Sequence, residues 1–70
     1  MYIVFVIENV YTKEFEPYGY EGTLDDLPEM VEEAKWAEGG VMAPEWKHVE
    51  THEYRDEAQA LKKWGQVHRS

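Results

Sequence analysis

The first part of the chain has the hydrophobic pattern of two β-strands. Residues 2–7 are β-branched or aromatic with no polar residue among them, which is typical of a strand covered on both faces or central in its sheet. Residues 14–20 resume an extended pattern, but Pro17 cannot donate a hydrogen bond to a neighbouring strand. We therefore predict a central strand, a turn within residues 9–13, and then an edge strand.

The next segment has the spacing of an amphipathic helix. Thr23 and Asp26 each precede an acidic residue by three positions, as helix-capping residues often do. Because Pro28 is tolerated only in a first turn, we predict a regular helix over residues 26–38 with Gly39 as its left-handed cap. One face of this helix is apolar: Leu27, Met30, Val31, Ala34 and Ala37. The opposite face is acidic: Asp25, Glu29, Glu32 and Glu33.

A third strand and a second helix are predicted in the last part of the chain. Strand alternation over residues 46–54 places one set of side chains on a common face: Trp46, His48, Glu50, His52 and Tyr54. Residues 56–64 begin with acids and end with lysines, which suits the helix dipole, and Gly65 should end that helix. Its apolar stripe is thin: Tyr54, Ala58 and Leu61.

These elements follow one another as β-β-α-β-α, which predicts a fold of the α+β class in a single domain, residues 1–70. A hairpin followed by a helical crossover of the usual hand places the third strand on the free side of the first. The expected sheet is three-stranded and antiparallel, in the order 2-1-3. One main helix packs on a face of this sheet, and the C-terminal helix is short.

The composition limits the class of protein. Seventy residues without a cysteine exclude disulfides, thiolate zinc sites and cysteine nucleophiles. The ten aromatic residues supply core volume for a short chain, and we expect the tryptophans Trp36, Trp46 and Trp64 to lie in the core. The apolar run 2–7 is too short for a membrane span, and no basic segment precedes it. We expect a soluble cytoplasmic protein with no membrane partner.

Charge is distributed very unevenly along the chain. All fifteen carboxylates lie between Glu8 and Glu57, where only four side chains are basic, so this part carries a net charge of −11. Residues 58–70 carry +3 from Lys62, Lys63 and Arg69. An acidic surface repels nucleic acid and attracts proteins that bind nucleic acid. We therefore expect no direct binding to nucleic acid.

The acidic helix face has two interpretations. In the first it is an ordinary solvated surface that aids solubility. In the second its carboxylates take the place of DNA phosphates on a basic protein surface. The second interpretation assigns phosphate surrogates to the helix: Asp25, Asp26, Glu29, Glu32 and Glu33. The edge strand would extend this surface with three acids and two aromatic anchors: Glu14, Glu16, Glu21, Tyr18 and Tyr20.

Few residues suggest metal binding or catalysis. His48, Glu50 and His52 share a face of a regular strand, so they form one alternative metal site, although this spacing is permissive rather than specific. The only serine is Ser70, no threonine has the context of a nucleophile, and no glycine-rich phosphate loop follows a strand. We therefore expect no enzymatic activity and no cofactor.

The chain is short and acidic, and its apolar strand at residues 2–7 is followed by an acidic helix at residues 25–33. In these respects it resembles small phage-encoded inhibitors, particularly anti-CRISPR proteins. This resemblance implies a non-enzymatic inhibitor in the bacterial host cytosol that blocks DNA binding by a CRISPR effector complex through DNA mimicry. Phage inhibitors of host RNA polymerase are also similar and imply a polymerase target. A DNA mimic has no evident use for a basic tail unless the tail packs on the acidic body or contacts the target separately.

Two further alternatives concern assembly. The chain is expected to be a monomer, or a dimer formed through the edge strand that contains Pro17. It is also compatible with a plain protein-interaction module without an inhibitory role.

Overall fold

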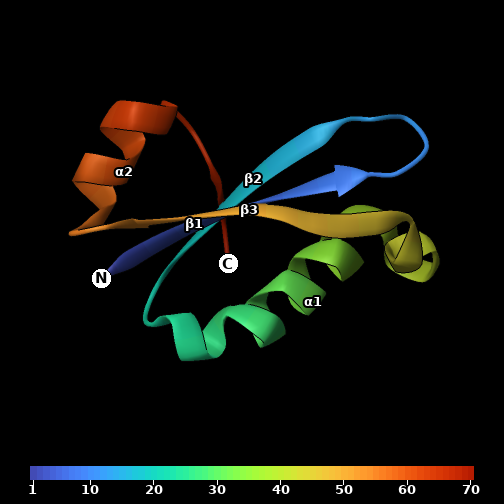
Figure 1. The fold of residues 1–70 in the computed structure, drawn as a ribbon, viewed down its shortest axis with the longest axis horizontal. Helices are drawn as coiled ribbons and strands as arrows, with labels where there is room; N and C mark the ends of the chain where they lie inside the picture. Colours follow the sequence, from blue (N-terminus) through green and yellow to red (C-terminus); the bar gives the residue numbers. More distant parts are fainter.

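The computed structural model describes residues 1–70 and contains a four-stranded mixed sheet with one helix on each face (Figure 1). Four strands make up the sheet: β1 (Tyr2–Asn9), β2 (Phe15–Glu21), β3 (Trp46–Tyr54) and β4 (His68–Arg69). Two helices cover it: α1 (Leu27–Gly39) and α2 (Glu57–Trp64). Short 3₁₀ segments flank α1: η1 (Leu24–Asp26) and η2 (Gly40–Glu45).

Strand β1 is central in the sheet, and its successive side chains pack alternately against α1 and α2. Its neighbours are β3 and β2, both antiparallel to it. Ile3, Phe5 and Ile7 join the hydrophobic cluster under α1, whereas Tyr2 and Val4 join the cluster under α2. This double burial explains the uninterrupted apolar run and confirms the predicted central strand.

The predicted sheet order is correct for the first three strands but incomplete. The full order is β3-β1-β2-β4, and β4 pairs with β2 in parallel, so the expectation of a three-stranded, purely antiparallel sheet is wrong. His68 lies opposite Tyr18, and the Ser70 amide donates to the Gly19 carbonyl at 3.0 Å. Strand β2 is therefore an edge strand over only part of its length. A two-residue strand is too short to have a detectable period.

Helix α1 lies where the sequence predicts, with a shift of one residue. Pro28 occupies its first turn, and Leu27, Met30, Val31 and Ala34 pack against the sheet. Ala37 was expected on this apolar face but is exposed. The left-handed residue that ends the helix is Gly40, with φ of 54°, and not Gly39, with φ of −107°.

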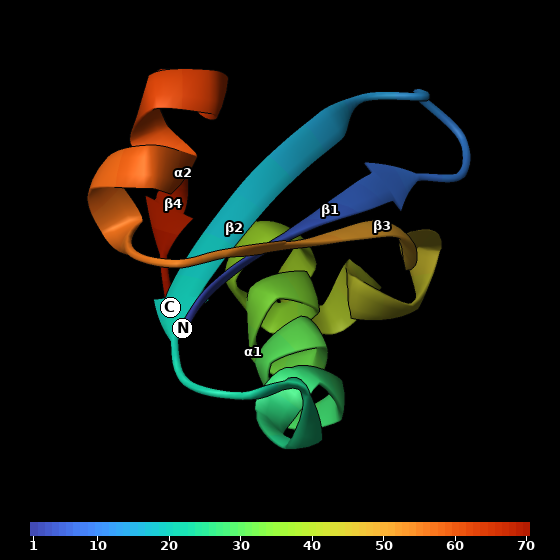
Figure 2. The ribbon, with the colours of Figure 1, turned by 60° about the vertical axis from the view of Figure 1, so that its left-hand side comes forward.

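Helix α2 covers the opposite face of the sheet (Figure 2). Asp56 accepts a hydrogen bond from the Gln59 amide at 2.8 Å, which caps the helix, and Gly65 ends it with φ of 79°. Its buried residue is Ala60, whereas the predicted Ala58 is exposed. Trp64 packs beside Tyr54 and donates to its hydroxyl at 2.6 Å. Neither helix is both long and apolar enough to cross a membrane.

Strand β3 contains a bulge that the sequence did not predict. Ile7 pairs with His48 but Val6 pairs with Glu50, so Val49 has no partner in β1. An extra residue in one strand reverses the side-chain alternation beyond it. His48 consequently lies on the face that α1 covers, and Glu50 lies on the face that α2 covers.

Candidate functional site

Helix α1 presents an acidic face to solvent, which we define as Glu29, Glu32 and Glu33. These three side chains are exposed because Val31 and Ala34 turn the other side of the helix towards the sheet. Glu32 lies 3.3 Å from the Lys35 ammonium group, whereas Glu29 and Glu33 have no ion-pair partner. The face therefore retains uncompensated negative charge.

Asp25 and Asp26 lie beside the acidic face, at the N-terminal end of α1. Both are exposed, and the Asp26 carboxylate accepts a hydrogen bond from the Thr23 amide at 3.4 Å. Carboxylates are favourable at this end of a helix because the helix dipole is positive there. All five predicted helix acids are therefore exposed, either on α1 or on η1 directly before it.

The predicted extension along β2 is much reduced. Glu16 lies 2.5 Å from His68, and Glu21 lies 2.9 Å from the N-terminal amine. Glu21 is also directly opposite Tyr2, so it belongs to the face that α2 covers. Only Glu14 remains without an ion pair, and it lies in the turn before β2. Two of these three carboxylates are therefore used within the fold.

Tyr18 and Tyr20 are core residues, so the expectation that they are exposed anchors is wrong. Their exposed fractions are 5% and 2%, and both rings pack near Phe5. The Tyr18 hydroxyl donates to Glu38 at 2.7 Å, and the Tyr20 hydroxyl donates to the Thr23 carbonyl at 2.7 Å. Burial raises the pKa of both hydroxyls, and the hydrogen bond to Glu38 raises that of Tyr18 further. The alternation of side chains along an edge strand defines two faces, but it does not indicate which of them a helix covers.

Trp36 is the exposed aromatic residue on α1, and the prediction that it lies in the core is wrong. Its side chain is 61% exposed, whereas Trp46 is buried and Trp64 is half-buried, as expected of core residues. Trp36 follows Glu33 by three residues and Glu32 by four, so it shares their helix face. This helical spacing was present in the sequence and would have been enough to place it.

The bulge in β3 separates the predicted metal ligands. The His48 ring lies edge-on to Phe5 and its Nε2 is 3.0 Å from the Glu50 carbonyl. His52 lies on the other face, where its Nε2 contacts the Glu50 carboxylate at 2.9 Å and its ring packs near Trp64. His48 therefore cannot share one ion with Glu50 and His52 in this arrangement.

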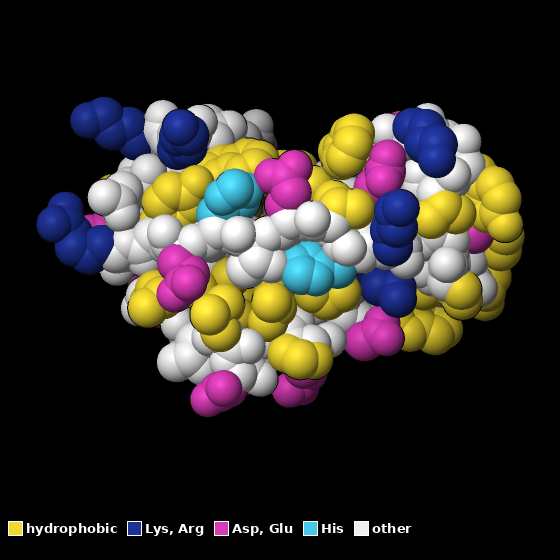
Figure 3. All heavy atoms as spheres, viewed as in Figure 1, with side chains coloured by type: hydrophobic (Ala, Val, Ile, Leu, Met, Phe, Trp, Pro, Cys, Tyr) yellow, Lys and Arg dark blue, Asp and Glu magenta, His cyan; other side chains and the backbone are white.

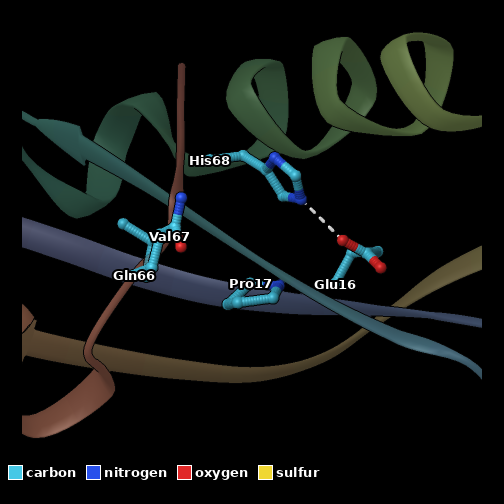
Figure 4. A pocket seen from close by; sticks show the side chains of 5 residues that line it. All are labelled: Glu16, Pro17, Gln66, Val67 and His68. Atoms are coloured by element: carbon cyan, nitrogen blue, oxygen red, sulfur yellow. Dashed lines mark hydrogen bonds and ion pairs between the residues drawn. The ribbon is translucent and has the colours of Figure 1, made fainter.

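The tail forms a different cluster, from three elements. His68 of β4 contacts Glu16 of β2 at 2.5 Å (Figure 4). Its Nε2 also lies 3.7 Å from the carboxylate of Glu38 in α1. One ligand atom from each of Glu16, Glu38 and His68 lies within 4.8 Å of the other two, so these three side chains are close enough to bind one cation. They are engaged with each other and with Tyr18, beside a cavity of about 300 Å³ lined also by Pro17 and Val67. In this arrangement the cluster holds the tail on the sheet.

Comparisons with protein-family models, curated proteins and solved structures found no match to this chain.

The basic residues of the tail do not neutralise the acidic face. Lys62 and Lys63 lie in the last turn of α2, on the far side of the sheet from α1, and Arg69 pairs with Glu57 at 2.9 Å. Figure 3 shows basic side chains over α2 and also at the opposite end of the molecule, and carboxylates along the side that α1 forms as well as elsewhere on this view. The tail thus packs on the body without forming an ion pair with Glu29 or Glu33.

Proposed function

We propose that this protein is a non-enzymatic inhibitor that binds a basic, nucleic-acid-binding surface of a bacterial protein complex. The observation that carries this proposal is the exposed acidic face of α1, where Glu29 and Glu33 have no ion-pair partner. The favoured target is a CRISPR effector complex whose DNA-binding surface the acidic face would occupy.

The proposed mechanism is competition for positive charge. Proteins that hold duplex DNA place Lys and Arg along a backbone that carries one negative charge per about 1.7 Å of helix axis. Carboxylates on a rigid helix can pair with those Lys and Arg side chains in place of DNA phosphates. Long-range electrostatic attraction between the two proteins speeds their association. The acids at the start of α1, Asp25 and Asp26, lengthen the charged surface.

RNA polymerase is the alternative target. Docking on polymerase through the edge strand would require exposed aromatic side chains there, and Tyr18 and Tyr20 of β2 are buried. A polymerase complex would therefore have to form through the same acidic face.

Charge reversal on α1 tests the proposal. We expect Glu29→Lys with Glu33→Lys to abolish binding to a purified DNA-free effector complex, because attraction becomes repulsion. Unfolding free energy should change by no more than about 1 kcal/mol, since both side chains are exposed and the helix-dipole effect is small. The measurement is competition with labelled target DNA, repeated with RNA polymerase.

The matched control reverses two other carboxylates that make no ion pair or side-chain hydrogen bond. Glu45→Lys with Glu53→Lys changes the net charge equally, but these residues lie in η2 and β3. This variant should keep most of the binding. Equal loss in both variants would show that only net charge matters, and undiminished binding by the α1 variant would contradict the proposal.

A further inference from the structure

Trp36 is an exposed aromatic side chain on the most acidic surface of the molecule. We propose that Trp36 is the anchor of this surface, and that the partner offers an apolar pocket bordered by Lys and Arg. This inference rests on the proposed function and specifies the chemistry of the partner. Charge alone would suit any polycation, whereas an indole beside the charged side chains selects a protein surface with a pocket.

The placement of Trp36 follows from helix geometry. It follows Glu29, Glu32 and Glu33 by seven, four and three residues, so carboxylates occupy the turns directly before it on the same face. The indole makes no hydrogen bond and no aromatic contact within the protein, unlike Trp64, whose N–H donates to Tyr54. Its N–H and its ring are therefore both available to a partner.

Two further exposed apolar residues follow Trp36 in the sequence. Val41 and Met42 follow in η2 and are 85% and 51% exposed. Figure 3 shows hydrophobic side chains over the end of the molecule that contains η2 and the β1–β2 turn. Exposed apolar groups that lie next to one another mark interaction sites more often than isolated ones do. A buried aromatic anchor surrounded by charged residues is a common arrangement of binding hot spots.

Charge decides which partner fits. A second copy of this chain would bring two acidic faces of a protein with net charge −8 together, and like charges facing each other oppose association. Nucleic acid is repelled for the same reason. A basic protein surface is attracted, and its apolar pocket would bury the indole while its Lys and Arg side chains pair with Glu29 and Glu33.

Two synthetic peptides of equal positive charge test this inference. One is an amphipathic helix with leucines along one face, and the other has serine at each leucine position. We expect the wild type to bind the leucine peptide about 30-fold more tightly, the effect of one hot-spot residue. Trp36→Ala should lose this preference while its thermal unfolding stays unchanged. Tryptophan emission should shift to shorter wavelength when the leucine peptide binds, and Trp36→Phe should abolish that shift.

Tyr11→Ala is the matched control, because Tyr11 is the most exposed aromatic residue and lies outside α1. It should keep the preference. Equal binding of both peptides by the wild type, or an undiminished preference in Trp36→Ala, would overturn the inference. Light scattering that shows a wild-type dimer and a Trp36→Ala monomer would also overturn it, since the occupant would then be a second copy. If Glu29→Lys with Glu33→Lys bound both peptides as the wild type does, the proposed function itself would fail.

Discussion

Individual tyrosine hydroxyls link the packing of this protein to pH. Tyr2, Tyr18 and Tyr20 are buried, and desolvation raises the pKa of each. In the unfolded chain these groups lose their protons near pH 10, whereas in the fold they retain them to higher pH. The unfolded state then binds fewer protons than the native state. Stability is therefore complete below the unfolded pKa and is lost as pH rises above it.

Tyr18→Phe tests this linkage at one residue. We expect the variant to lose less unfolding free energy than the wild type between about pH 9 and pH 11, because one raised pKa has been removed. At neutral pH it should be less stable by about 1–2 kcal/mol, since its hydrogen bond to Glu38 is lost. Urea unfolding at both pH values provides the measurement. An identical loss in both proteins would contradict the assignment, because the two proteins differ only in the Tyr18 hydroxyl.

At the scale of elements, β4 depends on side chains more than on its own backbone. It pairs with β2 over only two residues. His68 contacts Glu16 and its ring lies 4.7 Å from that of Tyr18, while Arg69 pairs with Glu57. These contacts tie the end of the chain to β2 and α2. A strand this short would otherwise fray, as chain termini commonly do.

His68→Ala should release β4 without unfolding the rest. We expect hydrogen exchange at the Ser70 amide to accelerate, because its bond to the Gly19 carbonyl is no longer held in place. Global stability should fall by no more than about 1 kcal/mol, as for other solvent-exposed pairs. His52→Ala removes a comparable histidine–glutamate pair in β3 and should leave this amide unchanged. Unchanged protection in His68→Ala would show that backbone pairing alone holds the strand.

For the whole molecule, the excess of negative charge produces two opposite responses to salt. The chain carries a net charge of −8, and its carboxylates on the α1 side repel one another. Its lysines in α2 lie on the other face of the sheet and cannot relieve that repulsion. Salt shortens the range of both this repulsion and any attraction to a basic partner.

A change in ionic strength tests these two responses to salt. Raising it from about 0.01 M to about 0.15 M shortens the Debye length from about 30 Å to about 8 Å. We expect the midpoint of thermal unfolding to rise, because internal repulsion is screened. Affinity for the basic target should fall over the same range. Calorimetry and a binding titration in the same buffers measure the two effects. Affinity independent of salt would contradict an electrostatic interface.

Local patterns were sufficient to predict five elements, their order and the acidic face of α1. Signals such as the apolar run at residues 2–7, the acids at the start of α2 and the glycine at position 65 act over a few neighbouring residues, so the sequence alone reveals them. Four features required the tertiary structure: β4, the bulge at Val49, the burial of Tyr18 and Tyr20, and the cluster around His68.

The physical reason is that these four features depend on pairing between distant segments. Strand alternation gives two faces but not which face a helix covers, and one extra residue at Val49 exchanges the faces beyond it. Trp36 differs from them, because helical spacing alone places it beside Glu29, Glu32 and Glu33. The sequence by itself thus determined the elements and the acidic face of α1, and the tertiary structure decided which aromatic and polar side chains remain available to a partner.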